Sequence, residues 1–347
     1  MNVNTESPKV SVIIPVHNRE KTIIRSIESV LNQNYSNLEL IIIDDYSTDN
    51  TVKIIKRYIK DKPNIELIRN KKKLGVSKSR NKGILNSTGE YIAFLDSDDT
   101  WEKNHLSSSI CCMKEENVEI AYSFWYRDVN GNVSSIKDNT SLMEKIITFS
   151  ENGNNKNTKE YFYFDKNFSL FALKESVYCF HICTLVMHRN VIKDCGLFNK
   201  YLKCNEDIDF SYRILMTKDF VLLKEEGYTY SIVTGSDSLY SFIDRRHINF
   251  DILLENEIFL KKVYLNVKYK IRFYKILKKN IRKHYTEDNI EKSLLIIEDN
   301  ISKRIRTLAI LSLGCKKFIP YILFYVLIMK YRNDFLRLFS IEDLCIS

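Results

Sequence analysis

Residues 10–45 read VSVIIPVHNREKTIIRSIESVLNQNYSNLELIIIDD, and this stretch decides the fold. The run 10–16 is short, apolar and β-branched, which is typical of a buried strand. Apolar residues then recur at helical spacing over 23–31 and predict an amphipathic helix. Residues 38–43, LELIII, predict a second buried strand. The stretch is therefore a strand, a helix and a strand in succession.

The same alternation continues to residue 95. A second helix is predicted after Ser47, Thr48 and Asp49, because these residue types favour a helix N-cap. A strand over 65–68, a helix over 75–85 and a strand over 91–95 follow. Strands that read as continuous apolar runs and alternate with helices indicate a mainly parallel sheet, with helices on both faces.

Polar clusters follow three of the predicted strands, and they are His17-Asn18-Arg19, Asp44-Asp45 and Asp96-Ser97-Asp98-Asp99. In an open sheet of this kind, ligands bind beyond the C-terminal ends of the strands, so we expect the site there. Asp96 and Asp98 lie two residues apart and can reach the same side of an extended segment. Two such carboxylates can hold Mg²⁺ or Mn²⁺ through oxygen ligands. An acidic loop or a helix N-cap is the alternative interpretation.

The composition suits a single large α/β domain with an appendage. The chain has 347 residues and 44% of them are hydrophobic, which excludes disorder of the whole chain. Residues 1–7 are polar and lack the pattern of a secretory signal, so we expect a cytoplasmic protein. The eight cysteines include the neighbours Cys111 and Cys112, which suit disulfide pairing badly, and we expect reduced thiols.

The pattern after Trp101 is weaker. A helix over 102–116 precedes a hairpin with its turn at Asn130-Gly131, and the polar segment 151–160 is expected to be mobile. A second ordered stretch over 180–214 contains an acidic group, Glu206-Asp207. The predicted organisation is a catalytic domain over 1–240, with halves at about 9–110 and 111–240, and a helical basic region over 241–347.

Four blocks, in this order and spacing, resemble glycosyltransferase family 2, the inverting nucleotide-sugar-dependent enzymes of the GT-A fold. The blocks are VSVIIPVHNRE, IIIDDYSTDNT, LGVSKSRNKGI and GEYIAFLDSDD. The resemblance is strong over residues 9–110 and moderate over 180–235. It implies a GT-A (Rossmann-like) α/β fold and the transfer of a hexose from a nucleotide diphosphate sugar, with UDP as the expected nucleotide.

The resemblance also implies roles for individual residues on the donor side. Donor nucleotide-binding positions would be Pro15, His17, Arg19, Asp44, Asp45, Arg80, Asp96 and Ser97. Either Asp44 or Asp45 would accept a hydrogen bond from the uracil imide, since a carboxylate offers acceptors only. Asp98 would be the principal ligand of a Mn²⁺ or Mg²⁺ ion, with Asp96 contacting the ribose or the metal.

On the acceptor side, Glu206-Asp207 followed by Arg213 resembles the acidic motif of the family. An inverting displacement needs a carboxylate opposite the leaving group to remove the acceptor hydroxyl proton. Asp207 is the predicted base and Glu206 the near alternative. Arg213 and Trp101 are placed on the acceptor side, although Trp101 could instead close the core.

Two departures from the family pattern bear on the donor site. Tyr46 stands where the family usually has glycine, so the turn after Asp45 must form without a residue that favours positive φ. His17 stands where an aromatic residue is usual. Neither departure removes a predicted metal ligand or the predicted base.

The net charge of +9 belongs to the C-terminal third, because residues 241–347 hold 21 basic and 12 acidic residues. The apolar run 318–329 contains Pro320 and is shorter than the roughly 20 residues that span a bilayer. The region could rest on an anionic membrane surface or pack on the catalytic domain. Surface binding would suit a saccharide or lipid-linked glycan acceptor at the cytoplasmic face.

Two other function classes compete with this interpretation. One is a noncatalytic lipid-surface or nucleic-acid binding protein on a decayed scaffold, and the other is a nucleotidyltransferase. The presence of Asp96, Asp98 and Asp207 argues against decay. The balanced charge of residues 1–240 argues against nucleic-acid binding. Products separate the classes, since a glycosyltransferase releases a nucleoside diphosphate and a nucleotidyltransferase makes pyrophosphate.

Overall fold

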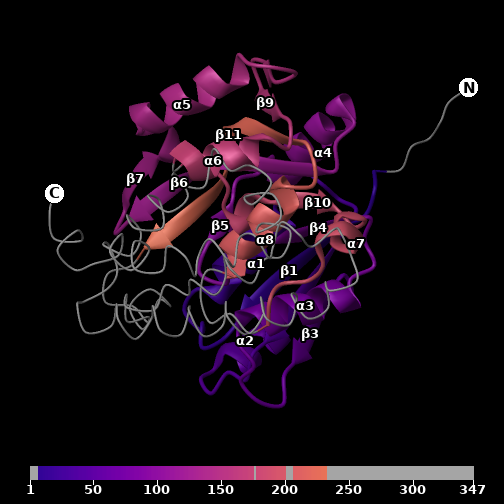
Figure 1. Cartoon of the computed structure of the whole chain (residues 1–347). Helices are drawn as coiled ribbons and strands as arrows, with labels where there is room; N and C mark the ends of the chain where they lie inside the picture. Colours follow the sequence, from indigo (N-terminus) through magenta and orange to yellow (C-terminus); the bar gives the residue numbers. More distant parts are fainter. Residues whose placement is uncertain (1–6, 176, 201–205, 233–347) are drawn as a thin grey trace, which may run out of the picture. The chain divides into compact units, whose positions relative to one another are not determined.

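A computed structural model describes residues 7–175, 177–200 and 206–232 (Figure 1). Its centre is one sheet with the strand order β3-β2-β1-β4-β10-β6-β11-β9-β8, with β5 beside β11 and β7 beside β6. The strands are β1 Val10–Val16, β2 Leu38–Asp44, β3 Ile65–Arg69, β4 Tyr91–Phe94, β5 Thr100–Trp101, β6 Ile120–Val129, β7 Asn132–Ser135, β8 Lys156–Asn157, β9 Tyr161–Phe164, β10 Val186–His188 and β11 Phe220–Ile232. The helices are α1 Ile23–Leu31, α2 Thr51–Tyr58, α3 Val76–Asn86, α4 His105–Glu116, α5 Thr140–Ser150, α6 Phe168–Glu175, α7 Val191–Cys195 and α8 Glu206–Leu215, with short 3-10 turns η1 Ile136–Asp138 and η2 Ile182–Thr184.

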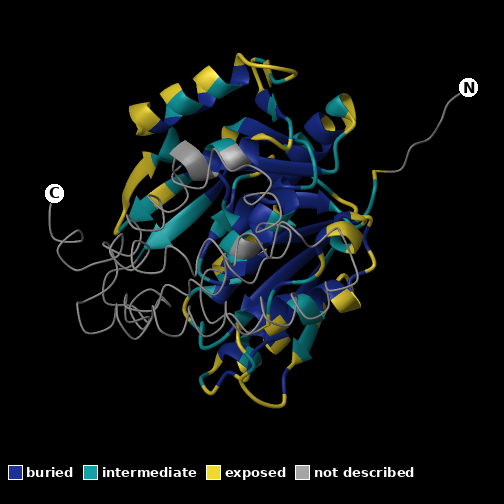
Figure 2. Cartoon of the chain, viewed as in Figure 1, coloured by how far each residue is buried: buried dark blue, intermediate teal, exposed yellow. Residues whose placement is uncertain are grey.

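The first half forms the predicted parallel arrangement. Strand β1 pairs in parallel with β2 on one side and with β4 on the other, and β2 pairs in parallel with β3. Every residue of β1 is buried, and the centre of the sheet is dark blue in Figure 2. Strands β2 and β4 flank β1, and α3 packs against it. The predicted α/β fold with a mainly parallel sheet is confirmed.

Helix α1 shows how the sequence pattern produces the packing. Its buried side chains are Ile23, Ser26, Ile27 and Val30, which recur every three or four residues and so share one face. Helix α4 ends at Asn117, whose φ of 51° is the left-handed conformation that commonly closes a helix.

The second half extends the same sheet with mixed pairing. Strand β10 is antiparallel to both of its neighbours, β4 and β6, and it joins the two halves. The predicted hairpin is confirmed as β6 and β7 around Asn130-Gly131. Strand β8 lies within the segment 151–160 and pairs with β9. The 13-residue strand β11 was not predicted.

Several predictions fall on residues whose placement is not described. The helical basic region 241–347 and the end of the domain 1–240 lie outside the described residues. Within the described ranges, no helix combines the length and the apolar character needed to cross a bilayer. Among the described residues, Cys111, Cys112, Cys179, Cys183 and Cys195 are free thiols.

Candidate active site

The three predicted polar clusters meet at one edge of the sheet. Because β1 pairs in parallel with β2 and β4, the loops after these strands leave from the same side. Direct contacts join the loops: the Asn18 backbone N–H donates to the Ser47 hydroxyl at 3.0 Å, and Thr22 Oγ1 donates to the Ser97 carbonyl at 2.9 Å. The loops therefore form one continuous polar surface.

The Asp44 and Asp45 carboxylates are buried and hold neighbouring backbone in place. Asp44 accepts from the Ser47 N–H and pairs with Arg69 at 3.1 Å. Asp45 accepts from Leu74 N–H at 2.7 Å and from Gly75 N–H at 2.8 Å, which fixes the start of α3. Since each carboxylate also has protein partners, only the remaining lone pairs can receive a nucleotide base.

The end of β1 lies beside the Asp45 backbone. Pro15 is opposite Ile43 in the parallel register, and His17 Nδ1 lies 2.9 Å from the Asp45 carbonyl oxygen. Tyr46 adopts a φ of 65°, which lies in the left-handed region. The turn after Asp45 therefore forms without glycine, as the sequence requires. Tyr46 is 44% exposed, and the Arg69 guanidinium lies 5.7 Å from the centroid of its ring.

Arg19 and Asp98 form an ion pair across two of the loops. Arg19 Nε lies 3.2 Å from Asp98 Oδ2, and Arg25 Nη2 donates to the Asp98 carbonyl at 2.5 Å. Burial raises the pKa of the Asp98 carboxyl, and the charge of Arg19 opposes this shift. Two predicted donor-site residues, from the ends of β1 and β4, are thus in contact.

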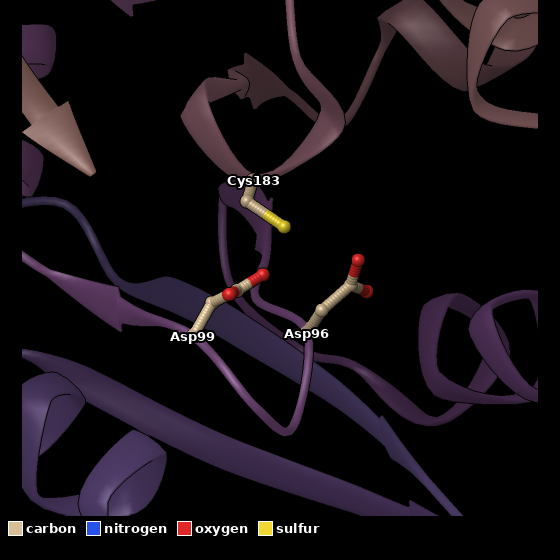
Figure 3. A group of neighbouring side chains, drawn as sticks. All are labelled: Asp96, Asp99 and Cys183. Carbon is tan, nitrogen blue, oxygen red and sulfur yellow. The ribbon is translucent and has the colours of Figure 1, made fainter. Parts of the chain in front are cut away.

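The other acidic residues of this run cluster with a thiol. Asp96, Asp99 and Cys183 each place a ligand atom so that all of these atoms lie within 4.8 Å of one another. Figure 3 shows Cys183 reaching from η2 toward the loop that carries both aspartates. Asp99 is additionally held by the Tyr228 hydroxyl at 2.5 Å and by the Ser231 N–H at 2.8 Å.

The donor set of this cluster fits a hard divalent cation only in part. Mn²⁺ and Mg²⁺ take oxygen ligands, which the Asp96 and Asp99 carboxylates supply. Burial, together with the two carboxylates, raises the pKa of the Cys183 thiol well above its usual range. A cysteine sulfur is a soft ligand that these hard ions do not favour, so the carboxylates fit the metal and the thiol does not.

The protonation of the two aspartates differs because their neighbours differ. Burial opposes ionisation of Asp96, but the Arg80 guanidinium outweighs it and lowers the pKa of that carboxyl. Burial and the charges of Asp98 and Asp96 raise the pKa of Asp99 well above its usual range. Asp96 is therefore the ionised member and the stronger candidate for a cation.

Arg80 connects the acidic run after β4 to the residue before the predicted base. Its Nη2 donates to Asp96 Oδ1 at 2.7 Å and its Nη1 donates to Glu206 Oε1 at 2.7 Å. Asp207 is the next residue and is half-buried. Burial raises the pKa of the Asp207 carboxyl, and Arg80 opposes the shift. Burial and the neighbouring Asp207 raise the pKa of Glu206.

The remaining predicted residues make mainly internal contacts. Ser97 is buried and its carbonyl accepts from Thr22. Trp101 is 5% exposed and its indole N–H donates to the Cys183 carbonyl at 2.7 Å, which favours the alternative that it closes the core. Arg213 donates to the carbonyls of Cys195 and Leu197, so it supports the loop before α8.

Sequence reasoning assigned no role to Tyr228, Ser231 or Cys183, although all three touch the acidic loop or lie beside it. The alternation in GYTYSI, residues 227–232, was a strand signal that could have placed Tyr228 on a sheet. No local signal could have brought Cys183 to Asp96, because the approach depends on η2 crossing the strand ends.

Comparison with known proteins identifies relatives over the first half. A family model described as "Glycosyl transferase family 2" matches residues 11–183. The UDP-Glc:alpha-D-GlcNAc-diphosphoundecaprenol beta-1,3-glucosyltransferase WfaP of Escherichia coli is 44% identical over 117 residues, which cover 34% of this chain and 46% of WfaP. The putative teichuronic acid biosynthesis glycosyltransferase TuaG of Bacillus subtilis is 39% identical over 117 residues, covering 34% of this chain and 46% of TuaG.

The fold has solved counterparts. The crystal structure of S. aureus TarS in complex with UDP-GlcNAc superimposes with a TM-score of 0.54 at 18% identity, covering 82% of this chain and 83% of that one. At this identity the likeness concerns the fold. The match spans less than half of WfaP and 20% of an uncharacterized glycosyltransferase of Rickettsia bellii, which is 42% identical over 146 residues, or 42% of this chain.

Proposed function

Because this chain belongs to glycosyltransferase family 2, we propose that it transfers a hexose from a UDP-sugar to a saccharide or lipid-linked glycan acceptor. The observation that carries the proposal is the Arg80 bridge, which brings the acidic run after β4 next to Glu206 and Asp207. A sugar transferase needs a diphosphate site and a base within reach of the same sugar. The two contacts of Arg80, with Asp96 and with Glu206, support placing both groups at one edge of the sheet.

The chain's residues can divide the work of an inverting displacement between them. The ends of β1 and β2, with His17, Arg19 and Asp45, bind the nucleotide. Asp207 accepts the proton of the acceptor hydroxyl while its oxygen attacks the anomeric carbon. The bond from that carbon to the diphosphate oxygen breaks, and its electron pair leaves with UDP. Ionised Asp207 is required at the outset.

A divalent cation suits the charge that develops on the leaving diphosphate. We assign Asp96 and Asp98 as its ligands, with Asp96 the ionised group that anchors it. When bound, Mn²⁺ or Mg²⁺ would supply positive charge to the departing phosphates. Asp98 would have to exchange its contact with Arg19 for the ion.

The acceptor class rests on the relatives. WfaP is named for a diphosphoundecaprenol-linked acceptor, and TuaG for teichuronic acid biosynthesis. We propose the same kind of surface-polysaccharide acceptor here, met at the cytoplasmic face of the membrane. The basic region 241–347 would then favour contact with anionic lipid.

The test begins with a panel of nucleotide sugars, scored by release of nucleoside diphosphate. Asp207→Asn should keep UDP binding and lose transfer. Asp98→Asn should lose Mn²⁺-dependent UDP binding, measured by calorimetry, while circular dichroism shows the fold unchanged. Asp61→Asn serves as the matched control, because Asp61 is exposed after α2 and is not assigned to the cation. Unchanged UDP affinity in Asp98→Asn would remove Asp98 as a metal ligand.

A further inference from the structure

Arg80 is a buried cation shared between two carboxylates that are far apart in sequence. It lies on α3, is 2% exposed, and reaches Asp96 after β4 and Glu206 at the start of α8 with two 2.7 Å hydrogen bonds. Its guanidinium also lies 5.4 Å from the centroid of the Phe198 ring. Such charge-assisted bonds in a buried setting are directional and strong, so they fix both carboxylates relative to α3.

The next residue on α3 makes a second tie to the acceptor side. Asn81 Nδ2 donates to the Phe198 carbonyl at 2.8 Å, and the Phe198 N–H donates to Asn81 Oδ1 at 2.9 Å. The Phe198 ring stacks on Phe210 of α8 with centroids 4.0 Å apart. Arg80 and Asn81 together therefore attach both the loop before α8 and its first residue to the donor half.

The contacts of Glu206 differ from those that a base requires. Glu206 is 6% exposed and its Oε1 is occupied by Arg80, whereas Asp207 is half-buried and more open. A base has to reach the acceptor hydroxyl with a free lone pair. Consecutive Cα atoms lie about 3.8 Å apart, so fixing Glu206 also fixes the backbone that carries Asp207.

We propose that Glu206 is a positioning residue, which through Arg80 holds Asp207 in place opposite the donor. This inference rests on the proposed function and separates the roles of the two neighbouring acids. Glu206 contributes a hydrogen-bond acceptor to Arg80 and takes no proton from the acceptor. The same cation ties Asp96 to the start of α8, so the donor and acceptor sides share one anchor.

The experiment compares Glu206→Gln, Glu206→Ala and Asp207→Asn in the full chain, with the exposed Glu225→Gln as the control. Glutamine can still accept the Arg80 hydrogen bond but cannot act as a base. We expect Glu206→Gln to keep kcat within about tenfold of the wild type, and Glu206→Ala to lose about a hundredfold, the scale of a misplaced catalytic group. Asp207→Asn should lose about a thousandfold, the scale of a missing general base.

Two further measurements make the outcome specific. The donor KM, and UDP affinity measured by calorimetry with Mn²⁺, should change little in Glu206→Gln, so that its effect falls on kcat. Glu206→Gln as inactive as Asp207→Asn would identify Glu206 as the base and overturn the proposal. Glu206→Ala with wild-type kcat would show that Glu206 positions nothing. A wild-type chain that binds no UDP would overturn the proposed function itself, and with it this role.

Discussion

Tyr46 carries its backbone in a conformation that crowds any side chain with a Cβ atom. Its φ of 65° lies in the left-handed region, and the residue sits between Asp45, which holds α3, and Ser47, which bonds to Asp44. These contacts hold the turn in its shape, so the strain remains. The Tyr46 ring also contacts the Arg69 guanidinium, and this contact offsets part of the strain.

Tyr46→Gly should therefore raise stability. Glycine adopts positive φ without the penalty of about 1–2 kcal/mol that a left-handed L-residue bears. Loss of the exposed contact with Arg69 would offset about 0.5–1 kcal/mol of that gain. We expect a net increase of about 0.5–1 kcal/mol in the free energy of unfolding, measured by urea denaturation. Tyr46→Ala, which loses the ring but keeps the strain, should show no increase. Equal gains in both variants would contradict this account.

If Asp207 is the base, as proposed, its carboxyl should set the pH dependence of the reaction. Burial raises its pKa above the ordinary aspartate value of about 4, with Arg80 opposing the shift. Because the base acts only when ionised, kcat/KM should fall as the pH drops through this raised pKa. The acid limb of the pH profile should consequently lie above pH 4, with full activity at higher pH.

The profile of Glu206→Gln provides the comparison. If Asp207 is the base, this variant keeps an acid limb, since its titrating group is still present. A profile that stays flat down to the ordinary aspartate range in the wild type would contradict the assignment.

At the scale of the element, β11 is irregular where it passes α4. Its parallel register with β6 shifts between Leu223 and Glu226 and again between Glu226 and Tyr228. Gly227 lies at this irregularity against two buried side chains. A Cβ atom built there would be 2.3 Å from His105 Nδ1 and 2.5 Å from Ser123 Oγ. The strand can pass at this distance only because Gly227 has no side chain.

Gly227→Ala should lower stability. His105 is 2% exposed and packs beside Trp101, so it has little room to move. Overpacking of this kind costs about 1–3 kcal/mol, which we expect to see in the free energy of unfolding. Val133→Ala on β7, where the side chain is 58% exposed, should change it little. Wild-type stability in Gly227→Ala would show that the neighbouring side chains yield.

The predictability of each element followed its local composition. Strands β1, β2 and β4 were predicted because each is a continuous apolar run, and β7 because Asn130-Gly131 marks a hairpin turn. Strand β11 was missed because Lys224, Glu225 and Glu226 interrupt its apolar residues. Glu226 is nonetheless buried, because Ser135 donates a hydrogen bond to it at 2.5 Å and Lys137 pairs with it at 2.9 Å. These partners come from β7 and η1, so the sequence of β11 does not reveal them.

The candidate site, too, was predictable only in part. The acidic residues were predicted, since they follow strand ends, but their contacts were not. Arg80 meets Glu206 across 126 positions, and Tyr228 meets Asp99 across 129. No local pattern encodes pairs at such separations, because tertiary packing makes them.

At the scale of the whole molecule, one continuous sheet in the described residues carries both the proposed donor side and the proposed acceptor side. Strand β10 lies between β4 of the first half and β6 of the second, and it is antiparallel to both. The two halves thus share a core, and the proposed catalytic residues come from both. The end of the domain at about residue 240 stays a prediction, because the described residues stop at 232.

A chain cut after residue 240 should accordingly bind UDP in the presence of Mn²⁺ as the full chain does. It should differ in membrane binding, because the excess positive charge lies in 241–347. We expect the full chain, and not the shortened one, to sediment with anionic liposomes at low salt. Asp98→Asn in the shortened chain is the control for specific nucleotide binding. Equal sedimentation of the two chains would place the membrane contact elsewhere.

The position of β10 between β4 and β6 also governs the order in which the protein can fold. Strand β4 is synthesised almost a hundred residues before its partner Val186–His188. The sequence separation between Trp101 and its partner Tyr228 is larger still. Contacts of such high sequence separation slow folding, since a long loop must close before they form. On the ribosome, the first half of the sheet would therefore emerge with an open edge at β4, which a chaperone or a misfolded neighbour can engage.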